Sequence, residues 1–160
     1  MAFRTLTAAF LVLAGGAAAQ PPPSRLDSAA AQAIVAGCVA HSLGRGQSHA
    51  IAIVDSGGQL VAALRMDGNG YGVMDFALAK ARASAAWGGA TAQLATGARE
   101  VPGFADAPHV VTVAGGVAVF SADGRERLGA VGVSGEAPAD DAACAEAGIA
   151  AAGLRARRAG

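Results

Sequence analysis

The sequence is poor in several residue types, and each shortage excludes some classes of binding partner or site. Only 4 % of its 160 residues are aromatic and 15 % are charged, and its acidic and basic side chains cancel to a net charge of zero. The chain has no basic stripe and no block of like charges, so it lacks the charge pattern of proteins that bind nucleic acids or anionic membranes. It also lacks the paired cysteine spacing of a zinc site. We therefore expect neither a nucleic-acid partner nor a structural metal.

The hydrophobic run at the N-terminus is too short to cross a bilayer. One positive charge, Arg4, precedes the apolar segment 6–14, and small residues follow it. These are the three parts of a cleaved secretory signal, whereas a transmembrane helix needs about 20 apolar residues. We predict a signal peptide over residues 1–19, a disordered leader over 20–25, and a periplasmic or extracellular protein without a membrane anchor. A buried N-terminal helix is the alternative.

Two cysteines, Cys38 and Cys144, are the whole thiol content. In an oxidising compartment, an even pair in a small domain favours a disulfide. The closed loop is long, and the chain-entropy model then gives about 4–5 kcal/mol of stabilisation. Two separate buried thiols are the alternative. If the bridge forms, neither sulfur is available to hold a metal.

Hydrophobic periodicity divides the rest of the chain into helices and strands. Helices are expected over 26–43, 73–87, 91–99 and 139–154, and strands over 49–55, 60–66, 110–113, 117–121 and 128–134. Turns that contain glycine join neighbouring strands, which indicates hairpins and an antiparallel sheet. We predict one α+β layered domain over residues 26–154, with an antiparallel sheet of about five strands and helices packed on it. A frayed basic tail over 155–160 follows it.

Several short motifs occur in an order that is similar to one known family. They are Val54-Asp55 with Gly58, Arg65-Met66-Asp67-Gly68, Ala79-Lys80-Ala81, Gly115-Gly116 and the glycine-rich segment 129–135. Together they resemble the GlcG/HbpS family, also called DUF336, which includes the C-terminal domain of PduO-type proteins. The resemblance implies a profilin-like or PAS-like layered fold, a homo-oligomer in many members, and haem binding. Two departures touch the binding region: Ala83 replaces a usual threonine, and Ala118 replaces a usual proline.

Haem needs an axial donor beside an apolar slot, and the chain offers three histidines. His41 ends the first predicted helix, away from the face that carries Cys38, so it can point outward at a ligand. His49 and His109 each open a predicted strand. We select His41 as the donor; the alternative for each histidine is a helix-capping or surface role.

A polar group of residues is the second candidate site. Arg65, Asp67 and Lys80 are expected to converge at one rim of the sheet. Backbone amides of Gly115, Gly116 and the segment around Ser134 are expected nearby. Cationic side chains and glycine-loop amides hold carboxylates well, so a haem propionate or a small organic acid fits. The equal alternative is that Asp67 pairs with Arg65 or Lys80 and orders the loop.

Two functions of different classes follow. The first is a secreted or periplasmic haem-binding protein with a sensing, storage or accessory role. The second is a protein that binds, or an enzyme that converts, a small organic acid or aldehyde. No catalytic residue is predicted, because Ser134 lies in Gly-Val-Ser-Gly and not in the Gly-x-Ser-x-Gly of a nucleophile elbow.

Overall fold

The structure is a computed structural model that describes residues 25–160. The predicted signal peptide, 1–19, and all but the last residue of the predicted leader, 20–25, lie outside the described residues. The elements are α1 (Ser28–Leu43), β1 (Ala50–Asp55), β2 (Leu60–Arg65), α2 (Tyr71–Trp87), α3 (Thr91–Glu100), the 3-10 turn η1 (Phe104–Asp106), β3 (Gly116–Phe120), β4 (Arg127–Ser134) and α4 (Pro138–Ala151). No helix in this part of the chain combines the length and the apolar character that a membrane span requires.

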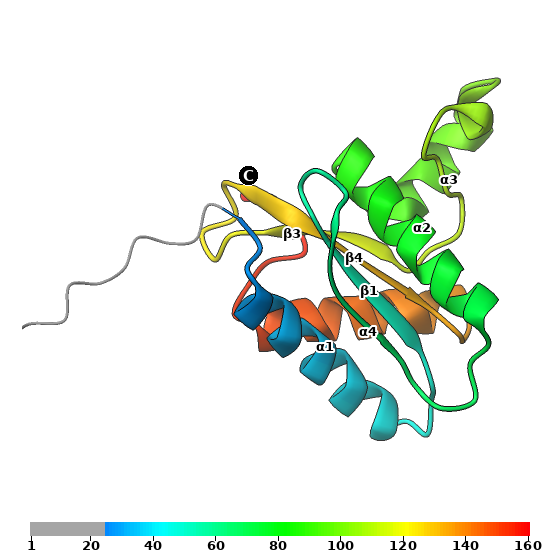
Figure 1. Cartoon of the computed structure of the whole chain (residues 1–160). Coiled ribbons are helices and arrows are strands. Elements are labelled where there is room, and N and C mark those ends of the chain that lie inside the picture. Colours follow the sequence, from blue (N-terminus) through cyan, green and yellow to red (C-terminus); the bar gives the residue numbers. More distant parts are fainter. Residues whose placement is uncertain (1–24) are drawn as a thin grey trace, which may run out of the picture.

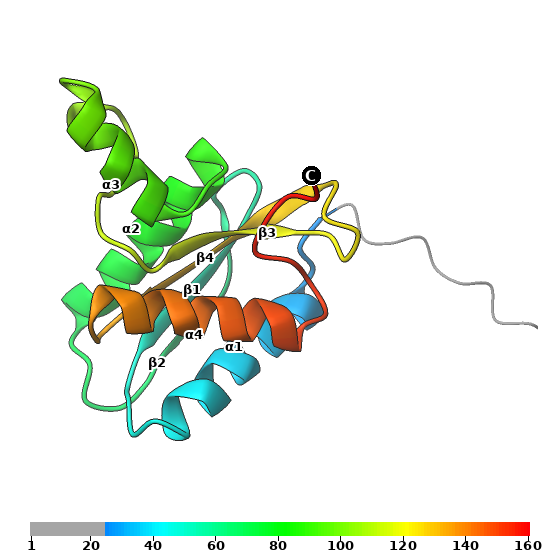
Figure 2. The ribbon, with the colours of Figure 1, turned by 180° about the vertical axis from the view of Figure 1, so that it is seen from behind.

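The four strands form one sheet in the order β2-β1-β4-β3, with every pair antiparallel. Alternate side chains of β1 point to opposite faces, as in any strand. Ile51 and Ile53 pack against α1 and α4, whereas Ala50 and Ala52 pack against α2. Figures 1 and 2 show the result: α1 and α4 cover one face of the sheet and α2 covers the other. The α+β layered class is thus confirmed.

Two glycines allow these layers to lie close together. A side chain at Gly132 of β4 would collide with the Ala77 carbonyl and the Ala81 amide of α2. A side chain at Gly148 of α4 would collide with the Ile34 carbonyl of α1. The backbones therefore approach one another in a way that only glycine permits at these positions.

The helices begin at local signals that the sequence shows in part. Asp27 caps α1, because its Oδ1 accepts a hydrogen bond from Ala30 N at 2.8 Å. The last helix, by contrast, begins at Pro138 without a side-chain cap. Asp141 lies in the first turn of this helix, and its carboxylate accepts from Glu136 N at 3.1 Å. That carboxylate belongs to the site described below.

The strand predicted over 110–113 is absent, which reduces the expected five strands to four. The valines of this segment have high strand propensity, but a strand also needs a partner edge. The Val113 carbonyl instead accepts a hydrogen bond from Thr91 Oγ1 at 2.7 Å. The segment therefore runs beside α3 as a connection rather than joining the sheet.

The C-terminal tail is ordered against the sheet instead of frayed. Arg155 forms an antiparallel bridge with Phe120, the last residue of β3, and Ala159 N donates to the Gly124 carbonyl at 3.0 Å. The Arg158 guanidinium also lies 5.7 Å from the centre of the Phe120 ring. Backbone pairing at the edge of β3 thus orders the tail 155–160, for which the basic composition predicted a frayed end.

Candidate functional site

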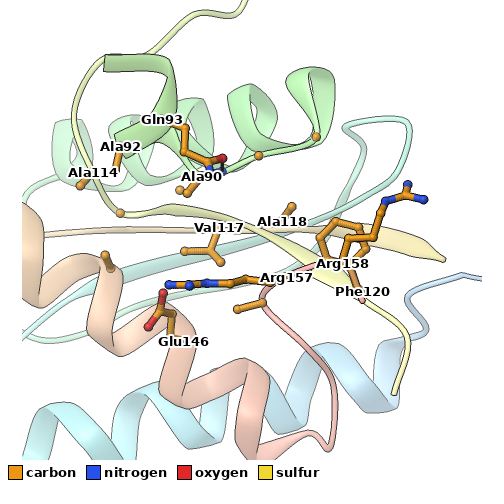
Figure 3. A pocket seen from close by; sticks show the side chains of 16 residues that line it. Ala90, Ala92, Gln93, Ala114, Val117, Ala118, Phe120, Glu146, Arg157 and Arg158 are labelled. Carbon is orange, nitrogen blue, oxygen red and sulfur yellow. Dashed lines mark hydrogen bonds between the residues drawn. The ribbon is translucent and has the colours of Figure 1, made fainter. Parts of the chain in front are cut away.

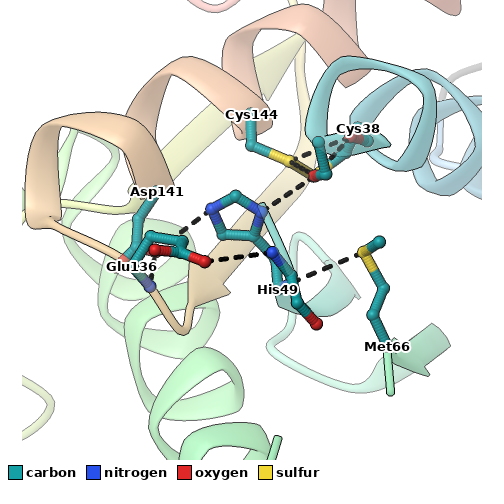
Figure 4. Close-up of a disulfide and its surroundings, with 8 residues drawn as sticks. Cys38, His49, Met66, Glu136, Asp141 and Cys144 are labelled. Atoms are coloured by element: carbon teal, nitrogen blue, oxygen red, sulfur yellow. Dashed lines mark hydrogen bonds and ion pairs between the residues drawn. A yellow bond between two sulfur atoms is a disulfide. The ribbon is translucent and has the colours of Figure 1, made fainter. Parts of the chain in front are cut away.

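The disulfide between Cys38 and Cys144 joins α1 to α4 across 106 residues of sequence. Both half-cystines are fully buried in the core between the two helices and the sheet. Figure 4 shows the bond with the polar side chains around it. The predicted pairing is formed, so neither sulfur is a thiolate that could hold a metal or haem iron.

A chain of polar side chains begins at this disulfide. Ser42 Oγ donates to the Cys38 carbonyl at 2.8 Å and lies 3.2 Å from Cys144 Sγ. The same hydroxyl lies 2.8 Å from His49 Nδ1. On the other side of the imidazole, His49 Nε2 is 3.6 Å from Asp141 Oδ1. Figure 4 shows the imidazole between the disulfide and the carboxylate of Asp141.

Asp141 pairs with Lys80 at the far end of this chain. Lys80 Nζ lies 2.8 Å from Asp141 Oδ2 and donates to the Val133 carbonyl at 2.9 Å. It also lies 4.8 Å from the centre of the Phe76 ring. Lys80 and Asp141 are 1 % and 2 % exposed, so the charges neutralise each other in the interior. The ammonium of Lys80 is therefore not available to a ligand.

Burial disfavours the protonated form of His49. Burial lowers its pKa below the usual 6.5, and the negative charge of Asp141 opposes that shift without reversing it. Ser, His and Asp are the components of a hydrolase triad, but nucleophilic catalysis needs a hydroxyl that a substrate can reach. Ser42 and His49 are fully buried, and Ser42 donates to a backbone carbonyl. The chain of contacts therefore connects helices and sheet rather than performing chemistry.

The predicted group of Arg65, Asp67 and Lys80 is not brought together. Arg65 and Asp67 are exposed, and the Arg65 guanidinium donates to the Asn69 carbonyl. Among the hydrogen bonds and ion pairs of residues 25–160, neither residue contacts Lys80. Lys80 lies instead beside Gly115, where a Cβ would be 2.8 Å from its Nζ. Ser134 is buried on β4, where it pairs with Ala50 of β1.

A groove of about 500 Å³ lies along the edge of β3, between the α2–α3 connection, α4 and the C-terminal tail. We call it the β3 groove (Figure 3). Its apolar lining includes Val117, Ala118 and Phe120, and its charged lining includes Arg157 and Glu146. The predicted Gly115 and Gly116 also line it. No histidine, cysteine, methionine or tyrosine does, so the groove offers no usual axial donor to haem iron.

The three histidines have different environments. His49 is fully buried, whereas His109 is exposed and lines two smaller hollows together with Arg82. His41, near the end of α1, is half-buried, and its Nε2 is enclosed without a hydrogen-bond partner among the described residues. Within residues 25–160, no three histidine, cysteine, aspartate or glutamate side chains gather in a way that could hold a metal ion.

Sequence reasoning missed Asp141 and His49 as parts of a buried network. One signal was visible, because Lys80 follows Phe76 by four residues and precedes Trp87 by seven, which places the three on one face of the helix predicted over 73–87. A lysine on an apolar stripe predicts either a buried partner or a long side chain that reaches water. The partner itself is 61 residues further along the chain, and no local pattern identifies it.

Solved structures share this fold. A PduOC–haem complex matches with a TM-score of 0.75 and 23 % identity over 84 % of this chain and 99 % of that one. A double mutant of Streptomyces reticuli HbpS matches with a TM-score of 0.73 and 29 % identity over 90 % and 97 %. Klebsiella pneumoniae ORFY, of family DUF336, matches with a TM-score of 0.74 and 21 % identity over 88 % and 97 %. Comparison with curated proteins finds no match.

The family model described as "Haem degrading protein HbpS-like" matches residues 26–150. The matched segment contains all four strands and both helical layers, and it ends one residue before α4 does. The resemblance seen in the short sequence motifs therefore extends over the whole folded domain, and the chain belongs to the HbpS-like family.

Proposed function

We propose that this protein binds haem, and that it does so outside the cytoplasm in a sensing, storage or accessory role. The observation that carries the proposal is the match of residues 26–150 to a family described by haem degradation. The PduOC–haem complex, which has the same fold, shows that a domain of this shape can accept the ligand. A cleaved signal over residues 1–19 would deliver the domain to that setting.

His41 is the residue that we propose holds the iron. When bound, haem would supply an iron centre, and the imidazole of His41 would hold it through a ring nitrogen. An enclosed polar atom without a partner is costly, and His41 Nε2 is such an atom. Coordination would give that nitrogen a partner. His49 Nε2 also lacks a hydrogen-bond partner, but His49 does not serve, because its ring is fully buried and this nitrogen faces Asp141 Oδ1 at 3.6 Å.

Arg65 is the proposed cation for a haem propionate. Its guanidinium is exposed at the end of β2 and donates to the Asn69 carbonyl through one terminal nitrogen, whereas Lys80 is held by Asp141. A guanidinium has five N–H donors, so its other nitrogens remain for a carboxylate. The predicted site thus retains Arg65 and loses Lys80 as a direct contact.

A hemin titration tests the proposal. The purified protein should shift the Soret band and saturate at a fixed stoichiometry. His41→Gly should weaken binding at least about tenfold, the effect expected when a bond to a charged centre is lost. Added imidazole should restore the shift in that variant, which a merely structural defect would not allow. His109→Gln is the matched control and should bind as the parent does.

The possible outcomes distinguish failure of the haem-binding proposal from failure of the His41 assignment. A titration without saturation contradicts haem binding itself. Saturation that is unchanged in His41→Gly contradicts the donor assignment but leaves haem binding in place. A repeat in air with ascorbate then shows whether the bound haem is degraded, because degradation removes the Soret band with time.

Processing is tested separately. Mass spectrometry of protein recovered outside the cytoplasm should show a chain that begins near Gln20. An intact Met1 would contradict the proposed secretion.

A further inference from the structure

His109 adopts an unusual backbone conformation. Within the described part of the chain, it is the one residue other than glycine with a positive φ, at 60°. It follows Pro108, and Val110 N donates to the Ala107 carbonyl at 3.2 Å. This is the pattern of a type II turn, in which glycine or asparagine normally occupies the position of His109. A positive φ is uncommon for residues other than glycine, although histidine and asparagine adopt it more readily than most.

Neighbouring side chains fix this turn against the end of α2. Trp87 Nε1 donates to the Pro108 carbonyl at 3.2 Å. The Trp87 ring in turn packs edge-on against Phe104, with ring centres 4.9 Å apart. The imidazole of His109 is therefore presented by a backbone with defined contacts.

Arg82 of α2 lies at the same place. Its Nε donates to the Gly58 carbonyl, in the turn between β1 and β2, at 3.3 Å. Figure 1 shows this turn beside α2. Arg82 is exposed and makes no ion pair among the described residues, so its two terminal nitrogens remain for a ligand.

Two adjoining hollows, of about 350 and 340 Å³, share Arg82 and His109 as lining residues. The first also contains the polar side chains of the β1–β2 turn. The second is lined by Leu78 and Val111 and carries Asp75 on α2. Asp75 precedes Arg82 by two helical turns, which is about 10 Å along the axis. The second hollow thus has a cation at one end, an apolar middle and an anion at the other end.

We propose that Arg82 and His109 bind the carboxylate of a small monocarboxylic acid whose apolar body lies on Leu78 and Val111. The carboxylate accepts hydrogen bonds from the guanidinium and the imidazole. Asp75 repels a second negative group at the far end, so dicarboxylates are disfavoured. This site stands apart from the haem proposal, because none of its residues is assigned to haem. It replaces the predicted organic-acid site at Arg65, Asp67 and Lys80.

Calorimetric titration of the protein with three probes of equal length tests the ligand class. Hexanoate should bind, hexanol should not, and adipate should bind several-fold more weakly than hexanoate. Asp75→Asn should remove most of the difference between hexanoate and adipate. Equal binding of all three probes, or inorganic phosphate binding as tightly as hexanoate, would overturn the proposal.

Two variants test the residues. Arg82→Gln should weaken hexanoate binding about tenfold or more, since a charged hydrogen-bond donor is lost. Arg125→Gln, at another exposed arginine, should leave binding unchanged. His109→Asn should also weaken binding with little change in melting temperature, because asparagine and histidine both tolerate a positive φ. If His109→Asn binds hexanoate as tightly as the parent, or if the two arginine variants behave alike, the proposal is wrong.

Discussion

Different interactions hold the helices on the two faces of the sheet. On one face, α1 and α4 are joined by a disulfide and by the buried polar chain that runs from Ser42 to Asp141. On the other face, α2 packs through small alanines, and Phe76 and Trp87 remain 38 % and 44 % exposed. The comparison places the cross-link and the buried polar chain on the α1–α4 face, and the two hollows that contain Arg82 and His109 beside α2.

Lys80 connects the two faces. It begins on α2, passes Gly115 at the end of the sheet, and ends on Asp141 of α4. The Gly115 position has a φ of 121° and no side chain to obstruct the ammonium. The α2 layer is therefore anchored by one buried charge pair in addition to its apolar contacts.

Removing the disulfide should have the largest effect. The Cys38→Ala, Cys144→Ala double variant loses the constraint on a loop of about 100 residues, which the chain-entropy model values at about 4–5 kcal/mol of unfolding free energy. Urea unfolding measures the loss. A reductant should destabilise the parent to the same extent and leave the double variant unaffected. A loss below about 1 kcal/mol would contradict the division between the two faces.

Breaking the Lys80–Asp141 pair should cause the second-largest loss of unfolding free energy. Lys80→Met keeps the volume of the side chain but leaves Asp141 buried and unpaired, which costs about 3 kcal/mol or more. The double variant Lys80→Met, Asp141→Asn should be less destabilised than the single one, because no charge is then buried alone. Urea unfolding of four proteins, namely the parent, Lys80→Met, Asp141→Asn and the double variant, gives the coupling energy between the two side chains. Additive losses would mean that the pair contributes nothing to joining the layers.

Lowering the pH should reduce the unfolding free energy, because His49 takes up a proton more readily in the unfolded chain. Because burial lowers the pKa of His49 in the folded protein, the unfolded chain binds a proton more readily below about pH 6.5. Stability is therefore complete above that pH and falls as the pH decreases toward the folded-state pKa, by at most about 1.4 kcal/mol per pH unit. His49→Gln should have a flatter profile between pH 6.5 and 5.5. Parallel profiles would show that His49 does not contribute.

The smallest effect is expected on the α2 face. Trp87→Phe removes the hydrogen bond from Nε1 to the Pro108 carbonyl in a partly exposed position, which is worth about 0.5–1 kcal/mol. Unfolding followed by circular dichroism measures it. Tyr71→Phe, at a side chain that is 83 % exposed, is the control and should change nothing. If Trp87→Phe lost as much unfolding free energy as Lys80→Met, the proposed difference between the two faces would be wrong.

The layered class and the element types followed from the sequence because periodicity is a local property. The stripe Ile34–Cys38 predicts the buried face of α1, and both residues are fully buried. The strand over 110–113 was wrongly predicted because its valines, too, were judged by a local property. Strand propensity is read one residue at a time, whereas a strand exists only where another edge is free to pair with it.

The site was less predictable because it depends on distant contacts. The cysteine pair could be predicted from an even count, but the pairing of Lys80 with Asp141 could not, since it joins two helices that are far apart in sequence. His109 was considered as one of three candidate haem donors, at the start of a predicted strand, and not as part of a turn. Its turn conformation depends on Pro108 and on Trp87, which a scan for strands does not consider.

The order of strands has a consequence for the time at which the chain can fold during synthesis. The central pair of the sheet is β1 with β4, so residues near 50 must wait for residues near 134. The first helix likewise completes its packing only when α4 has been made. Contacts of such long sequence separation slow folding. A growing chain that stops before α4 lacks the helix that the disulfide joins to α1, so the α1–α4 layer is completed only after α4 has been made.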